Sequence, residues 1–314
     1  MEPSCCNVCG GALRMRFAAV LDPQTGEQFS IIECEACGLG HTTPQPVSFP
    51  PYYGPTYHGG RHGFTAKYCM RRRLRLLASV AGDVGQGRRL LDVGCGDGTF
   101  LLGARDRCWS VAGTELNPAR ARAAGLDLVH ETIEEARAAA PFDCITLWHS
   151  LEHIRDPRAT LKSLAGMLAP SGLLVVAVPD AEGLQARLFG PSWFHLDVPR
   201  HLYHFGLRSL NVLLDMAGFA PLRRWHQEFE YDLLGWSQSA LNLISSTPNL
   251  FFNQLTGRPT EAGRAEVAAS YSLGIALSAL ALPATAIGAL SRRGGTIIVA
   301  ASHKQSTLLE RDGG

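Results

Sequence analysis

The stretch Leu90–Gly98 reads LLDVGCGDG, and it decides which fold we expect for this chain. An apolar run of strand character leads directly into Gly94, Gly96 and Gly98. Glycines let a strand turn sharply into a helix and let a ligand approach the backbone closely. The spacing G-x-G-x-G differs from the G-x-G-x-x-G of dinucleotide-binding proteins. Because Asp92 places a carboxylate beside the turn, the pattern disfavours a pyrophosphate and favours a ligand with a cationic group.

A second acid follows the next strand-like run. Glu115 lies 23 residues after Asp92 and closes the segment WSVAGTE. An acid at the end of that strand can bind two ribose hydroxyls. Together, the glycine turn and Glu115 favour an adenosyl ligand that carries a positive charge and no phosphates.

Strand-like and helix-like runs alternate from Arg89 to Val178. This alternation predicts βαβ units and hence an α/β, Rossmann-like, doubly wound parallel sheet. The expected strands are LLDV, WSVAGTE, LDLVH, FDCITLW and GLLVVAVP, with helices such as 98–107 and 158–168 between them.

Four cysteines form two pairs near the N-terminus. Cys6 and Cys9 are followed by Gly10, and Cys34 and Cys37 are followed by Gly38. Each C-x2-C-G element is typical of a zinc knuckle, and two knuckles supply the four thiolates of a closed structural site. We therefore predict a zinc ribbon in which a hairpin joins the knuckles and the metal has a structural role.

The motifs LLDVGCGDGTFL and FDCITLWHSLEHIRDP, together with Glu115, resemble class I S-adenosylmethionine-dependent methyltransferases over residues 89–229. The resemblance implies a seven-stranded sheet whose last strand, near 295–301, is antiparallel. It also implies S-adenosylmethionine as cofactor and methyl transfer as the reaction (EC 2.1.1.-). The four-cysteine module upstream narrows the likeness to bacterial zinc-ribbon methyltransferases associated with sugar or cell-surface-glycan modification.

The same resemblance implies the roles of individual residues. Asp92, Gly94, Gly96 and Gly98 would surround the methionine moiety, and Glu115 would bind the ribose. Leu116 would pack on the adenine, and one residue of His130-Glu131-Thr132, for which we take Thr132, would contact the adenine edge. Trp148 and His149 would lie near the reactive methyl group.

Histidines are the natural bases for methyl transfer near neutral pH. His153 lies after the fourth strand, in HSLEH, where ubiquinone-type O-methyltransferases carry Glu-x-x-Glu-His and bind a divalent ion; here His149 replaces the first Glu. A structural role for this segment is the alternative. The expected catalytic residues are His153, His201, Tyr203 and His204.

The segment 193–205 carries three of those residues among several aromatic side chains. Aromatic faces beside polar groups suit a sugar or another polyol in a cavity, and they equally suit core packing. The basic run Lys67–Arg75 is expected to be a solvated helix face, with a phosphate-bearing substrate or anionic lipid as the alternative. His58 is a further histidine of interest.

Charged residues make up 18% of the 314-residue chain, below the usual value of about 25%. Residues 233–257 and 267–291 carry no charged side chain. We expect a buried or substrate-covering helical pair there, with peripheral membrane contact and true membrane spans as alternatives. The net charge of +1 argues against a nucleic-acid partner.

The expected division of the chain has five parts: zinc ribbon 1–45, linker and helix 46–88, methyltransferase core 89–231, apolar helical insertion 232–293, and final strand and tail 294–314. The favoured function is methylation of a small molecule or glycan, such as a sugar, nucleotide-sugar or lipid-linked acceptor. RNA methylation and a non-catalytic donor-binding scaffold are the alternatives. Paired thiols and an N-terminus without an apolar signal core predict a cytoplasmic location.

Overall fold

The computed structural model describes residues 4–53, 63–82 and 86–304. His58 and part of the predicted linker lie outside these residues. The chain divides into two compact units. Unit 1 comprises Met1–His62, Pro179–Val212 and Trp225–Ile297, and unit 2 comprises Gly63–Val178, Leu213–Arg224 and Ile298–Gly314.

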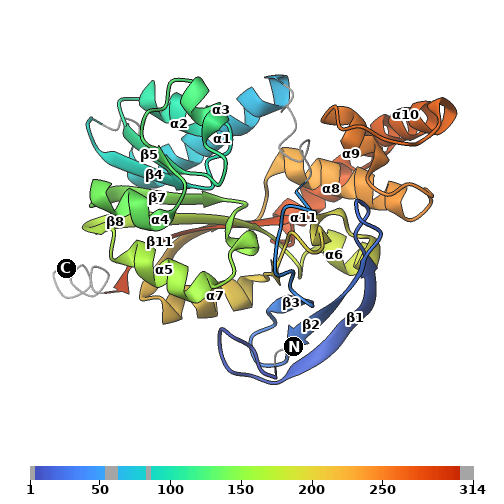
Figure 1. Cartoon of the computed structure of the whole chain (residues 1–314), viewed down its shortest axis with the longest axis horizontal. Helices are drawn as coiled ribbons and strands as arrows, with labels where there is room; N and C mark the ends of the chain where they lie inside the picture. Colours follow the sequence, from blue (N-terminus) through green and yellow to red (C-terminus); the bar gives the residue numbers. More distant parts are fainter. Residues whose placement is uncertain (1–3, 54–62, 83–85, 305–314) are drawn as a thin grey trace. The chain divides into compact units, whose positions relative to one another are not determined.

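Unit 2 is built on a seven-stranded sheet of order β10-β11-β8-β7-β4-β5-β6 (Figure 1). The sheet is mostly parallel, and its last strand, β11, is antiparallel. The predicted α/β fold is therefore confirmed. The strands are β4 (Arg89–Val93), β5 (Ser110–Thr114), β6 (Val129–His130), β7 (Phe142–Trp148), β8 (Leu168–Pro179), β10 (Phe219–Trp225) and β11 (Thr296–His303).

Burial on both faces explains why these strands are almost continuously apolar. Leu90 and Leu91 on β4 and Ile145 on β7 are fully buried. In Figure 1 the helices α1, α2 and α3 lie on one face of the sheet and α5 lies on the other. The helices of this part of the chain are α1 (Gly63–Ala81), α2 (Thr99–Arg105), α3 (Ala119–Ala123), α4 (Ile133–Ala136), α5 (Pro157–Ala165) and α7 (Leu207–Met216).

Unit 1 contains a second sheet, of order β1-β2-β3-β9, in which consecutive neighbours are antiparallel. The strands β1 (Leu13–Leu21) and β2 (Gln28–Cys34) form the hairpin expected between the cysteine pairs. The third strand is β3 (Gly40–Thr43), and β9 (Tyr203–His204) pairs with it although it lies far away in the sequence. The segment 193–205 thus completes the sheet of the cysteine-bearing module.

A buried ion pair ties this segment to the hairpin. Nη2 of Arg200 lies 2.8 Å from Oδ1 of Asp22, and Nε of Arg200 donates to Oδ1 of Asp197 at 2.7 Å. Arg200 is 3% exposed and Asp22 is fully buried. Removal of Arg200 would leave the buried carboxylate of Asp22 without its cationic partner, so the pair helps to fix where the segment sits.

The apolar region near the C-terminus is helical. It forms α8 (Phe229–Asn242), α9 (Leu250–Leu255), α10 (Arg264–Leu280) and α11 (Leu282–Leu290), and α6 (Leu184–Phe189) belongs to the same unit. Most residues of α10 and α11 are exposed, so burial, one half of the expectation, is wrong for these two helices, and a substrate-covering role stays a prediction. In the described part of the chain no single helix is long and apolar enough to cross a membrane, although α10 and α11 together, bent by 43°, have the length and composition.

Candidate functional site

The glycine turn follows β4 and adopts a left-handed backbone at each glycine. The φ angles are +75° at Gly94, +59° at Gly96 and +78° at Gly98, a region that other residues rarely occupy. A Cβ atom at Gly98 would lie 2.3 Å from Cδ1 of Leu126, whereas a Cβ at Gly96 would meet nothing within 4 Å. The turn is therefore closely packed at Gly98 and open at Gly96, where a ligand can reach the backbone.

Glu115 is tied to this turn. Its Oε2 accepts a hydrogen bond of 2.8 Å from the backbone N–H of Gly96. The backbone N–H groups of Gly94 and Cys95 both donate to the carbonyl oxygen of Thr114, the residue before Glu115. A carboxylate accepts up to about four hydrogen bonds, so the bond to Gly96 leaves capacity for a diol.

Asp92 lies beneath the turn and is 3% exposed. Its Oδ1 accepts a 2.7 Å hydrogen bond from the hydroxyl of Thr146 on the neighbouring strand β7. Ser150, after the end of β7, donates to the carbonyl oxygen of Val93 at 2.7 Å. These bonds join the ends of the two central strands, where open α/β sheets place their ligands.

Trp148 ends β7 and is 5% exposed. Its ring packs edge-on against Phe100, with 5.6 Å between the centroids, and the Arg73 guanidinium lies 4.9 Å from the ring centroid. Within residues 4–53, 63–82 and 86–304, the indole Nε1–H has no hydrogen-bond partner. A buried N–H of this kind is costly unless a ligand accepts from it.

The sequence analysis treated Arg73 as one member of the basic run Lys67–Arg75 and assigned it no separate role. Arg71 and Arg75 are exposed, as expected for a solvated face, but Arg73 is 3% exposed. It lies four residues after Cys69 and four before Leu77, both buried, so it belongs to the inward face of α1. This i, i+4 position was the available signal. The expectation of a solvated run is wrong for Arg73.

His149 adopts a left-handed backbone with φ of +53°, which is strained for a residue with a side chain. Its Nδ1 lies 3.6 Å from Oε1 of Glu152, a fully packed residue that is 1% exposed. Glu152 and His153 belong to a short 3-10 helix, Leu151–His153. The structure thus pairs Glu152 with His149 directly after β7.

The residues expected to lie near the adenine differ in their exposure and in their hydrogen bonds. Leu116 is 82% exposed, as an apolar platform for a ring would be before the ring binds. The hydroxyl of Thr132 accepts from the backbone N–H of Glu135 at 3.2 Å and so caps α4. His130, by contrast, has a buried Nε2 without a partner in the described part of the chain.

These features suit S-adenosylmethionine. The open backbone at Gly96 accommodates a closely approaching ligand, and Glu115 is placed to accept from ribose hydroxyls. The buried Nε1 of Trp148 and Nε2 of His130, which have no partner in the described part of the chain, can form hydrogen bonds with a ligand. The guanidinium of Arg73 adds a positive charge next to Trp148, which suits the carboxylate of the methionine moiety.

The four predicted zinc ligands come together in unit 1. The sulfur atoms of Cys6, Cys9, Cys34 and Cys37 all lie within 4.8 Å of one another. The Sγ–Sγ distance is 3.8 Å between Cys6 and Cys37 and 3.4 Å between Cys9 and Cys34. A tetrahedron with metal–sulfur bonds of about 2.3 Å has edges of roughly 3.8 Å, so the arrangement suits a tetrahedral metal. The neighbouring Cys5 is exposed and outside the cluster.

The surroundings of the cluster are closely packed. A Cβ atom at Gly11 would lie 2.9 Å from the sulfur of Cys34 and 2.7 Å from Cβ of Ala36. Burial raises the pKa of Cys6 to about 11 and also raises the pKa of Cys37. Buried thiols of this kind become thiolates when a cation compensates the charge.

The segment 193–205 is buried in unit 1. Trp193, Leu196 and Val198 belong to an apolar core with Phe29 and Ile31 of the hairpin. Core packing, one of the two alternatives that the sequence left open, therefore describes these side chains.

The candidate bases in this segment differ in their hydrogen bonds. The Thr42 hydroxyl donates to the carbonyl oxygen of His201 at 2.6 Å and lies 3.0 Å from Nε2 of His204. Since its one proton is used, the hydroxyl accepts from His204, and Nε2 of His204 is a donor. Burial holds the pKa of His204 well below its ordinary value. Tyr203 accepts at its hydroxyl from the side-chain amide of Asn7.

His201 is arranged differently. Its Nδ1 lies 2.9 Å from the carbonyl oxygen of His195, which can only accept, so Nδ1 carries a proton. In the neutral ring the lone pair is then on Nε2, which lies 3.9 Å from Oδ2 of Asp197. The buried His41, whose pKa burial lowers to about 4, packs edge-on against Tyr203 and was not singled out by the sequence.

Comparison with known proteins supports the reading of unit 2. Residues 61–223 match the profile of a family described as a methyltransferase domain. A ubiquinone biosynthesis O-methyltransferase from Escherichia coli O157:H7 is 32% identical over 111 residues, which are 32% of this chain and 46% of that protein. The chain therefore spans about half the length of the curated relatives it matches.

Two solved structures align with about three quarters of this chain. Coclaurine N-methyltransferase, bound to N-methylheliamine and SAH, has a TM-score of 0.46 and 17% identity over 74% of this chain and 70% of that chain. A SAM-dependent methyltransferase from Archaeoglobus fulgidus has a TM-score of 0.44 and 16% identity over 76% of this chain and 97% of that chain. Because the family profile covers more than half of the 314 residues, the chain belongs to this methyltransferase family, and its domain is of the class I S-adenosylmethionine-dependent type.

Proposed function

We propose that the protein transfers a methyl group from S-adenosylmethionine to a small molecule or glycan. The hydrogen bond between Gly96 and Glu115 carries the proposal, because it holds an acid for the ribose against the open glycine turn. Bound S-adenosylmethionine would supply an electrophilic methyl group on its sulfonium. The residues of this chain bind that donor, orient the acceptor and remove a proton from it.

The donor residues divide by their chemistry. Glu115 accepts from the ribose hydroxyls, and Leu116 supports the adenine. Asp92, held by Thr146, presents negative charge at the end of β4 toward the cationic part of the ligand. Arg73 balances the carboxylate of the methionine moiety, and Trp148 donates its indole N–H to the ligand.

His201 is the base that the hydrogen bonds favour. Its Nδ1 proton is held by the His195 carbonyl, so Nε2 accepts a proton from the acceptor and the imidazolium remains bonded on the other side. The carboxylate of Asp197 stabilises that cation. His204 is a weaker base, since burial lowers its pKa and Thr42 occupies its Nε2.

The four-cysteine cluster is proposed to bind structural zinc. Four thiolates leave no open coordination position, so the metal stabilises the hairpin module rather than taking part in methyl transfer. Thiols that must stay reduced for this role support a cytoplasmic location.

For the acceptor we propose a sugar, nucleotide-sugar or lipid-linked glycan. The resemblance of the sequence to zinc-ribbon methyltransferases of sugar or cell-surface-glycan modification supports this acceptor, and the curated relatives are of the small-molecule type. The first test is calorimetric titration of the zinc-loaded protein with S-adenosylmethionine and S-adenosylhomocysteine. Micromolar binding of either is the expected result; no binding by folded protein would contradict the proposal.

The acceptor and the base are then tested together. Candidate glycans are incubated with radiolabelled S-adenosylmethionine, and the assay follows label transfer. His201→Asn keeps an amide that can donate to the His195 carbonyl but removes the accepting Nε2. We expect unchanged donor affinity and a kcat lowered about 100-fold or more. An unchanged kcat would exclude His201 as the base.

A further inference from the structure

The helices α10 and α11 show an inverted distribution of side chains. Their buried positions hold small or polar residues, Ser270, Gly274, Thr285 and Gly288. Their large apolar side chains point outward instead. The most exposed of them is Leu290, at 86%. The other outward-facing large residues are Tyr271, Leu273, Ile275, Leu280, Leu282 and Ile287.

This outward surface, which we call the α10–α11 face, is unusually poor in hydrogen-bonding groups. No charged residue occurs from Val267 to Ser291. Among the exposed side chains of α10 only Tyr271 and Ser272 are polar between these limits. Protein interfaces form about one hydrogen bond per 100–200 Å² and have a polar rim. The α10–α11 face has too few polar groups to form that number of hydrogen bonds, whereas the acyl chains of lipids require none.

Charge at its edge favours an anionic surface. Arg292 and Arg293 lie two and three residues after Leu290 and are exposed. The sequence contains no aspartate or glutamate between Val267 and Lys304, so these arginines have no acidic neighbour along the chain. Basic residues beside exposed apolar ones bind anionic headgroups while the apolar side chains enter the acyl region.

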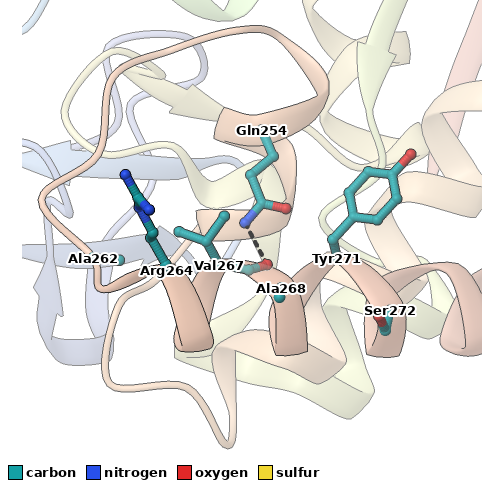
Figure 2. Close-up of a pocket in the computed structure, with 7 residues that line it drawn as sticks. All are labelled: Gln254, Ala262, Arg264, Val267, Ala268, Tyr271 and Ser272. Carbon is teal, nitrogen blue, oxygen red and sulfur yellow. Dashed lines mark hydrogen bonds between the residues drawn. The ribbon is translucent and has the colours of Figure 1, made fainter.

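A hollow of about 630 Å³ opens at the other end of α10 (Figure 2). It is lined by Gln254, Ala262, Arg264, Val267, Ala268, Tyr271 and Ser272. Figure 2 shows Gln254 donating to the carbonyl oxygen of Val267, a bond of 2.8 Å. Arg264 begins α10 at this end, although Glu261 and Glu266 offset its charge locally. The positive end of the face is therefore the Arg292–Arg293 end.

The geometry also decides between lying on a membrane and crossing one. At 1.5 Å per residue, the 17 residues of α10 extend about 25 Å, less than the roughly 30 Å of a hydrocarbon core. The bend of 43° at Ala281 separates α10 from α11. A bent pair with one apolar face and one face packed on the protein is suited to the membrane interface.

We propose that the α10–α11 face docks on a membrane that contains anionic phospholipids. Leu280, Leu282, Ile287 and Leu290 insert below the headgroups, and Arg292 and Arg293 bind the phosphates. This inference does not depend on the methyltransferase activity. It does imply that the acceptor is available at a membrane surface.

Vesicle sedimentation tests the proposal with the full chain. Vesicles of phosphatidylcholine alone are compared with vesicles that also contain phosphatidylglycerol. We expect binding to the mixed vesicles, weakened at least about tenfold by Leu280→Glu together with Leu290→Glu. Changing Arg292 and Arg293 to Gln should cost roughly fivefold per arginine on the mixed vesicles only.

The matched control is Leu188→Glu on α6, where the side chain is 67% exposed and away from this face in the sequence. It should bind like the wild type. Wild-type protein that stays in the supernatant with both vesicles would overturn the proposal. So would a dimer, detected by light scattering, that Leu280→Glu dissociates, because the face would then be covered by a second copy. Donor binding measured on the same variants separates this outcome from a failure of the proposed function.

Discussion

The backbone N–H of Gly96 donates a hydrogen bond of 2.8 Å to Oε2 of Glu115, and this bond joins the ends of two neighbouring parallel strands. The glycine turn after β4 and the acid after β5 therefore form one unit. A ligand that reaches the open side of Gly96 meets a carboxylate whose position is already fixed, so little ordering cost remains on binding.

Glu115→Ala should weaken S-adenosylmethionine binding about 100-fold, because two charge-assisted hydrogen bonds to the ribose are lost. Glu115→Gln keeps an oxygen that can accept from Gly96 and should lose only about tenfold. Calorimetric titration measures both. Equal affinities for Ala and wild type would show that Glu115 does not bind the ribose.

Gly98→Ala and Gly96→Ala should separate packing from ligand access. The added methyl group at Gly98 collides with Leu126, so we expect a loss of about 2–4 kcal/mol in the free energy of unfolding. At Gly96 the space is open, and only the left-handed backbone costs roughly 1–2 kcal/mol. Thermal unfolding and donor titration should show the larger binding defect at Gly96. A larger binding defect at Gly98 than at Gly96 would contradict ligand access to the backbone at Gly96.

Arg73→Met should weaken donor binding about 30-fold, since a buried charge beside Trp148 is removed while a similar length of side chain is kept. The control is Arg75→Met on the same helix, where the side chain is exposed. The two variants are compared by titration with S-adenosylhomocysteine. Should both bind like the wild type, Arg73 has only a packing role.

Cys34→Ser should reduce the metal content from about one zinc per chain and lower the thermal midpoint, because a three-thiolate site binds zinc less tightly. Cys5→Ser should do neither, since Cys5 is exposed and outside the cluster. Elemental analysis and thermal scans decide. A folded wild type without zinc would rule out the structural site.

Burial and the neighbouring charge of Glu182 raise the pKa of Asp180 from 3.8 to about 7. An acid whose pKa is higher in the folded state favours folding while it is protonated, so its stabilising effect is lost as the pH rises from about 4 to 7. Asp180→Asn, which cannot ionise, should therefore gain thermal stability relative to the wild type between pH 5 and pH 8. The difference between the two melting temperatures isolates Asp180 from the histidines. A constant difference would contradict the raised pKa.

Local sequence patterns were enough for much of the fold. The apolar run before the glycines predicted β4 and its turn because a parallel strand buried on both faces is continuously apolar. The cysteine spacing predicted the cluster because a C-x2-C-G turn brings two sulfur atoms to the same side.

The sequence was less informative for the segment 193–205 and for the apolar helices. Its dense aromatic side chains suited a cavity as well as a core, and only the pairing of β9 with β3 placed them in the core of unit 1. The low charge of 267–291 suggested burial, yet the helices expose their large residues and bury their small ones. Composition does not state which side of a helix faces outward.

The sequence alone thus predicted a parallel α/β sheet, the glycine turn, the acid after the second strand and the clustered cysteines, because each leaves a pattern along the chain. The seven-stranded order came from the family resemblance rather than from these patterns. Only the tertiary structure showed that Arg73 reaches Trp148, that His201 and His204 differ in their protonated nitrogen, and that Leu290 faces outward. These facts depend on packing between distant segments, and the free energy of such packing is shared among many side chains rather than recorded in any one motif.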